Sequence, residues 1–133
     1  NNLTGAIPQE IGTLTNLKEL SLSSNNLSGS IPKTVKNLVN LEKLSLYDNQ
    51  LFGAIPSSLG NLTKLEEIML SDNFLFGNVP SNLASLDNLK ILMINNNDLQ
   101  GDFANLGKSL PNGVQFEFAN IGERKKAALA GTD

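Results

Sequence analysis

The sequence contains no cysteine and no histidine in its 133 residues. Without cysteine there are no disulfide bonds, thiolate metal sites or cysteine nucleophiles, and without histidine there is no catalytic triad or zinc site built on imidazole. The lack of cysteine does not identify the redox compartment, because such a chain is compatible with reducing and oxidising surroundings. We therefore expect no metal site and no bound cofactor.

The sequence also lacks long apolar runs and an excess of basic residues. No apolar stretch approaches the roughly 20 residues that span a bilayer, and the N-terminus lacks a charged-then-apolar signal segment. The formal net charge is -3, and the only dense basic run is Arg124, Lys125 and Lys126. We therefore expect neither a nucleic acid partner nor direct insertion of this segment into a membrane. With 40% hydrophobic and 17% charged residues, the composition is that of one globular domain.

What the sequence does contain is a repeat with a period of 24 residues. The stretch SSNNLSGSIP at residues 23–32 returns as YDNQLFGAIP at 47–56 and as SDNFLFGNVP at 71–80. Aligned at this period, an invariant Asn recurs at Asn1, Asn25, Asn49, Asn73 and Asn97, and Leu and Gly form two more unbroken columns. A fixed period of 20–29 residues with L-x-x-L-x-L-x-x-N-x-L is the signature of a leucine-rich repeat.

A single repeat cannot fold alone. It holds about seven apolar side chains, each of which stabilises by roughly 1.5–3 kcal/mol when buried, whereas fixing each backbone residue costs about 1–2 kcal/mol. Stacking of successive coils is therefore obligatory, and the chain is predicted to form a solenoid.

Each column has a predicted structural role. Alternation such as Leu20-Ser21-Leu22 predicts a strand with the leucines inside, and stacked coils then form a parallel sheet. The structural Asn column, which comprises Asn25, Asn49, Asn73 and Asn97, is expected to turn its amides inward toward unpaired backbone groups. The Gly column suits a turn with φ > 0, and the Pro column fixes φ on the convex side.

The motif L(S/F)G(S/A)IP, as at residues 27–32 and 51–56, resembles that of plant-type leucine-rich repeat proteins. These include receptor-kinase ectodomains, receptor-like proteins and polygalacturonase inhibitors. The resemblance covers residues 1 to about 103 and, more loosely, continues to about 120. It implies an α/β-type repeat solenoid, a superhelix with a parallel concave β-sheet, short second strands and a 3-10 or irregular convex side. It also implies a location in the extracellular space or the secretory lumen.

The two ends depart from the pattern. We expect one solenoid over residues 1–120, with about five coils of which the last is degenerate, and a polar cap or tail over 121–133. Phe116 and Phe118 keep the two inward columns, which predicts a last strand near 115–119. The paired-cysteine caps of the family are missing, so we expect a fragment of a longer ectodomain. Its first coil is then predicted to expose Leu3, Ile7, Ile11 and Leu14.

Partner binding is predicted on the variable outward positions of the sheet. Met69, Ile91 and Met93 are expected to point outward on neighbouring strands, with Tyr47 one strand away. A contiguous apolar patch on a polar surface marks a contact site more often than an isolated residue does. Along the lateral edge, three phenylalanines either bind a partner as well or pack on one another over the second strands: Phe52, Phe74 and Phe76.

Other polar motifs are weaker. Sequons at Asn2, Asn26 and Asn61 are possible glycosylation sites, but NLT and NLS also arise from the repeat consensus. Asp48 and Asp72 have the ligand type for a divalent cation, yet two carboxylates alone are more often solvated or paired with turn amides. Two acids without a predicted cleft do not make a glycosidase, and we expect no enzyme.

Several functions remain compatible with the sequence. The leading hypothesis is a non-catalytic module that binds a protein or peptide ligand within a secreted or cell-surface protein. The second is a structural subunit that packs against neighbouring subunits of a larger assembly. An ice-binding surface is disfavoured because Met and Tyr interrupt the Ser columns. Inhibition of a cell-wall glycosidase is another function found in the family, but no residue of this sequence points to it specifically.

Overall fold

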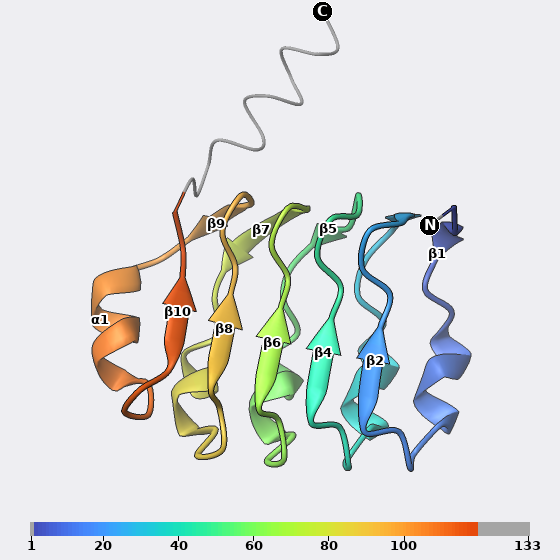
Figure 1. The fold of residues 1–133 in the computed structure, drawn as a ribbon. Coiled ribbons are helices and arrows are strands. Elements are labelled where there is room, and N and C mark those ends of the chain that lie inside the picture. Colours follow the sequence, from blue (N-terminus) through green and yellow to red (C-terminus); the bar gives the residue numbers. More distant parts are fainter. Residues whose placement is uncertain (1, 120–133) are drawn as a thin grey trace, which may run out of the picture.

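The computed structural model describes residues 2–119, which form a solenoid of stacked coils (Figure 1). One strand from each coil enters a five-stranded parallel sheet with the order β10-β8-β6-β4-β2. These strands are β2 (Glu19–Ser21), β4 (Lys43–Ser45), β6 (Glu67–Met69), β8 (Ile91–Met93) and β10 (Gln115–Glu117). The register joins equivalent residues of successive repeats, such as Leu44 with Ile68 and Ile68 with Leu92. The predicted parallel sheet is therefore confirmed.

Short second strands follow each turn away from this sheet. They are β1 (Thr4–Ala6), β3 (Asn26–Ser28), β5 (Phe52–Gly53), β7 (Phe74–Asn78) and β9 (Asp98–Gln100). β1 pairs with β3, while β5, β7 and β9 form a three-stranded parallel set. Gly53 has φ of 85°, a left-handed conformation that side chains with a Cβ rarely adopt, so the Gly column is required by the turn.

The opposite side of each coil is a five-residue 3-10 helix. These are η1 (Gln9–Thr13), η2 (Lys33–Asn37), η3 (Ser57–Asn61) and η4 (Ser81–Ser85), and each follows a proline in the N-cap position. Proline suits this position because its fixed φ starts the turn and its missing N–H is not needed there. The convex 3-10 side agrees with the expected plant-type architecture.

The core runs along the solenoid between the sheet and the 3-10 side. Its central side chains are fully buried, among them Leu44, Leu65, Ile68, Leu75 and Leu92. At the first coil, Leu3 and Leu14 are about half exposed, at 53% and 50%. The prediction of an exposed Ile7 is wrong, because Ile7 belongs to the buried core cluster and is 5% exposed. Ile11 is partly buried against the same cluster.

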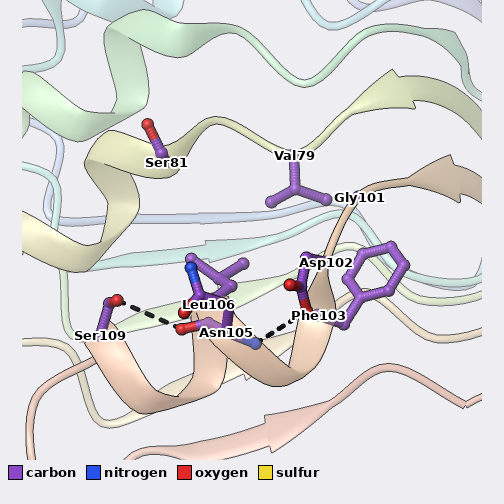
Figure 2. A pocket seen from close by; sticks show the side chains of 8 residues that line it. All are labelled: Val79, Ser81, Gly101, Asp102, Phe103, Asn105, Leu106 and Ser109. Carbon is purple, nitrogen blue, oxygen red and sulfur yellow. Dashed lines mark hydrogen bonds between the residues drawn. The ribbon is translucent and has the colours of Figure 1, made fainter.

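The last described coil replaces the 3-10 turn by an α-helix, α1 (Phe103–Ser109). No element was predicted for these residues. Asp102 caps the helix, since its side chain accepts a hydrogen bond from the Asn105 backbone N–H at 3.0 Å, and no proline follows it to fix a 3-10 start. A hollow of about 230 Å³ lies between α1 and the preceding coil. Figure 2 shows Val79 directed toward the helix that carries Leu106.

Aromatic rings close this end of the described core. Phe103 and Phe118 stack with ring centroids 5.7 Å apart, and Phe116 lies 4.8 Å from Phe118. The strand β10 falls within the predicted 115–119 segment, and Phe118 packs on Phe103 and Phe116 at the core side but is not buried. Phe118 is 40% exposed because β10 is the last strand of the sheet order. The cap or tail predicted over 121–133 lies outside the described residues.

Candidate functional site

A ladder of buried asparagines holds the sheet at the point where each coil turns away. Asn73 is fully buried. Its amide Nδ2 donates to the backbone carbonyls of Leu46 (3.0 Å), Leu70 (3.3 Å) and Ser71 (3.1 Å), while its Oδ1 accepts from the Leu51 N–H at 3.0 Å. Asn49 and Asn97 repeat this pattern, whereas Asn25 donates only within its own coil and accepts from the Leu3 N–H. These bonds join neighbouring coils and fix the residues that follow each strand.

Those following residues form the rim of the candidate site. Asp48, Asp72 and Asn96 occupy equivalent corner positions, each with φ between 57° and 59°. Asn and Asp tolerate this left-handed conformation better than most side chains, which explains the residue types found there. The side chain of Asn96 donates through Nδ2 to Asp72 Oδ1 at 2.7 Å. The Asp72 carboxylate is therefore held in place by a neutral amide.

The concave face contains a hollow of about 370 Å³ over three neighbouring coils. It is lined by Tyr47, Met69, Ser71, Asp72, Met93 and Asn95. The two methionines are in register on β6 and β8, and both are half-buried. Tyr47, which follows β4, is 38% exposed. The structure thus brings together three of the four residues predicted for the concave patch.

Ile91 lies on β8 next to the hollow but does not line it. It precedes Met93 by two residues, so it points to the same face about 7 Å further along the strand. Its register partners are Glu67 and Gln115, not the residues of the hollow. Ile91 therefore extends the apolar surface toward the entry side of the sheet.

The floor of the hollow is polar and internally hydrogen-bonded. Ser71 is 4% exposed although it belongs to an outward column, and its hydroxyl donates to Asn95 Oδ1 at 2.7 Å. Ser45 is buried in the same way and shares a hydrogen bond with Ser23. The sequence predicted outward positions for these serines but could not show that they are buried. Ser71 lines the hollow together with Tyr47 and the two methionines.

One acidic side chain lines this hollow, and two others lie on neighbouring coils. Asp72 lines it, Asp48 occupies the equivalent corner of the preceding coil, and Glu117 is the register partner of Met93. The only basic residue within the five strands of the sheet is Lys43, and its Nζ lies 3.6 Å from Glu67 Oε2. Within residues 2–119 no group of three or more acids, cysteines or histidines forms a metal-binding cluster. The surface therefore presents a hollow with tyrosine and methionine walls, a polar floor and the Asp72 carboxylate in its lining.

The lateral edge carries the predicted phenylalanines. Phe52 and Phe74 are register partners on β5 and β7, and Phe76 pairs with Asp98 on β9. Phe52 and Phe76 are 51% and 49% exposed, whereas Phe74 is partly buried. This phenylalanine edge lies on the second strands, separate in the fold from the five-stranded sheet.

Two family models of the leucine rich repeat match the chain, over residues 1–51 and 64–86. Together they cover more than half of it, and the repeat geometry described above agrees with them. The chain therefore belongs to the leucine-rich repeat family. The similar solved structures include receptor-kinase ectodomains from Arabidopsis. Within the family, the chain is therefore a plant-type leucine-rich repeat protein.

Three of these structures illustrate the range. The ectodomain of the receptor kinase SOBIR1 from Arabidopsis thaliana is 36% identical, with a TM-score of 0.81 over 89% of this chain and 64% of that one. The Arabidopsis receptor kinase HAESA, in complex with the peptide hormone IDA and the co-receptor SERK1, is 33% identical, with a TM-score of 0.79 over 89% and 20%. A plant ice-binding protein is 32% identical, with a TM-score of 0.85 over 90% and 39%.

The chain spans less than two thirds of the length of each of these three structures. Because one fold includes both receptor ectodomains and an ice-binding protein, the fold alone does not define a ligand. A comparison with curated proteins found no match. None of the helices in residues 2–119 has the length and apolar character needed to cross a bilayer.

Proposed function

We propose that the chain is a non-catalytic module of a secreted or cell-surface protein and that it binds a protein or peptide on the concave face of its sheet. The observation that carries this proposal is the hollow framed by Tyr47, Met69 and Met93. The equivalent outward positions of the first coils are polar, with Ser21 and Ser45 in the methionine column. Exposed methionines adapt to varied partners, and aromatic residues are enriched at interfaces.

The similar proteins support a peptide or protein ligand. HAESA has the same fold and is in complex with a peptide hormone and a co-receptor. The ectodomain of GASSHO1/SCHENGEN3, 46% identical over 72% of this chain, is in complex with CASPARIAN STRIP INTEGRITY FACTOR 2. The phenylalanine edge, with Phe52, Phe74 and Phe76, is proposed as a second contact for a partner larger than a short peptide.

The extracellular location rests on the receptor ectodomains among the similar structures and on the sequons. Asn2, Asn26 and Asn61 are all exposed, so glycans at these positions would meet no buried surface. None of the three lines the concave hollow. Glycosylation there is therefore compatible with ligand binding on the sheet.

The proposal predicts that the methionine column is required for binding. The double variant Met69→Ser and Met93→Ser places serine at both positions, as the equivalent positions Ser21 and Ser45 of earlier coils already have. Folding should therefore be preserved. Removing two central apolar contacts should weaken binding of peptides selected on the wild-type chain by about tenfold or more. The peptides come from a random displayed dodecapeptide library, and affinity is measured by fluorescence anisotropy of the synthetic peptides.

A matched variant at the lateral edge gives the control. Phe52→Ser and Phe76→Ser introduce the residue that Ser28 provides in an earlier coil, and they also remove two large exposed side chains. Short peptides selected on the wild type should keep their affinity for this variant within about twofold. Peptides that bind the methionine variant as tightly as the wild type would overturn the assignment of the concave face.

A further inference from the structure

We infer that the concave hollow is a specificity pocket for one arginine side chain of an extended peptide segment. This inference rests on the proposed function and adds the chemistry of the ligand. Met69 and Met93 are neighbours in register and together line the hollow, and Tyr47 lines it from the preceding coil. A volume of about 370 Å³ accommodates a long side chain.

The Ser71 hydroxyl and Asn95 Oδ1 in the floor are hydrogen-bonded to each other. The Ser71 hydroxyl already donates to Asn95 Oδ1 at 2.7 Å, so this hydroxyl proton is not available to a ligand. A neutral polar side chain would therefore gain little by entering, because it would exchange hydrogen bonds with water for weaker ones. The methionines favour an aliphatic stem instead, which arginine supplies along its first three carbons.

The charge of the rim selects the head group. Asp72 lines the hollow, and its Oδ1 accepts from the neutral amide of Asn96 at 2.7 Å, which orients the carboxylate without neutralising it. A carboxylate has further lone pairs, so it can still accept from a cation. Glu117 beside Met93 adds a second negative charge, while Lys43 is paired with Glu67. An acidic ligand side chain would meet like charges here.

Arginine fits better than lysine for a geometric reason. A guanidinium is planar and delocalised, so it stacks on an aromatic face and still donates to a carboxylate in its own plane. Tyr47 and Asp72 both line the hollow and offer these two partners. The compact, strongly hydrated ammonium of lysine can pair with Asp72 but gains less from the ring.

The first test is the composition of selected peptides. A random displayed dodecapeptide library is panned on the full chain and on the Asp72→Asn variant, and the recovered sequences are counted. Arginine should be enriched several-fold over the unselected library on the wild type, with aspartate and glutamate depleted, and the enrichment should vanish on Asp72→Asn. A library that yields binders without basic residues, or with acidic ones, overturns the inference.

The second test isolates the guanidinium. A selected peptide is synthesised with arginine, with the neutral isostere citrulline and with lysine, and each affinity is measured by fluorescence anisotropy. Citrulline should bind the wild type about tenfold more weakly than arginine, and lysine should fall between them. On Asp72→Asn the arginine and citrulline peptides should bind alike. Equal loss from citrulline in both proteins would mean that the arginine contacts another site.

A remote acid provides the charge-matched control. Asp87→Asn changes the net charge by the same amount at an exposed residue between η4 and β8, outside the hollow. It should leave the preference for arginine over citrulline unchanged, whereas a general charge effect would lower that preference as Asp72→Asn does.

Failure of the proposed function would give a different result: either no peptide is recovered, or the recovered peptides bind the Met69→Ser and Met93→Ser variant as tightly as the wild type. Peptides that need the methionines but not a basic residue contradict only the inference.

Discussion

Replacing Asn73 by leucine is expected to lower the free energy of unfolding by about 3–5 kcal/mol. Leucine matches asparagine in shape, but it removes three donated hydrogen bonds and one accepted bond at a fully buried position. The Leu51 N–H in the preceding coil is then left without its partner, whereas the Leu46 carbonyl keeps the bond from the Asn49 amide. A buried polar group without a partner costs about 1–3 kcal/mol. Urea unfolding followed by circular dichroism measures the loss.

The same substitution at the first coil provides the control. Asn25 is 8% exposed, and it donates to Leu22 and Ser23 of its own coil while accepting from the Leu3 N–H. Leu3 is 53% exposed, so water can replace the lost bond there. Asn25→Leu should therefore cost less than about 2 kcal/mol. Equal losses for the two variants would show that the ladder does not act by joining buried coils.

Most of the fold could be predicted because each repeat imposes the same constraints on its neighbours. The period of 24 identifies equivalent residues, and the structure pairs those same equivalents, as in Leu44 with Ile68. The Pro column predicted an irregular convex side, which the N-cap position of Pro32 and Pro56 explains. A residue that recurs in every coil has one environment, so its role follows from the pattern alone.

The parts that could not be predicted are those where a residue occurs once. The helix α1 follows from the Asp102 N-cap and from the absence of the proline that starts the 3-10 turn in earlier coils, and neither feature belongs to the repeat pattern. Phe118 fills an inward column, yet it has no following coil in the described sheet to cover it. A repeat pattern assumes a neighbouring coil on both sides, so it overestimates the burial of a residue where one of these coils is missing.

The candidate site was predicted in part for a related reason. Alternation along the strands placed Tyr47, Met69, Ile91 and Met93 on one face. It could not show that Ser71, Asp72 and Asn95 complete the lining of a hollow to which Ile91 does not belong. The shape of a surface depends on residue size across three coils, whereas periodicity along the chain reports only direction.

Replacing Ile68 by alanine is expected to lower the free energy of unfolding by about 3–4 kcal/mol. Ile68 is fully buried on β6, between its register partners Leu44 and Leu92, so a cavity would open between two coils at once. Leu20→Ala removes a side chain from the same column at the edge strand β2, where Leu44 is the single register partner. This second variant should cost about 2 kcal/mol or less, as measured by the same urea unfolding.

The comparison between these two positions separates stability from binding. Ile68 and Met69 are adjacent on β6, and their side chains point to opposite faces of the sheet, one into the core and one toward the hollow. At urea concentrations below its unfolding transition, where it is folded, Ile68→Ala should therefore bind the selected arginine peptides with an affinity within about threefold of the wild type. A larger loss in the folded variant would mean that the cavity shifts β6 and, with it, the wall of the hollow. Circular dichroism and anisotropy on the same samples distinguish unfolding from this displacement.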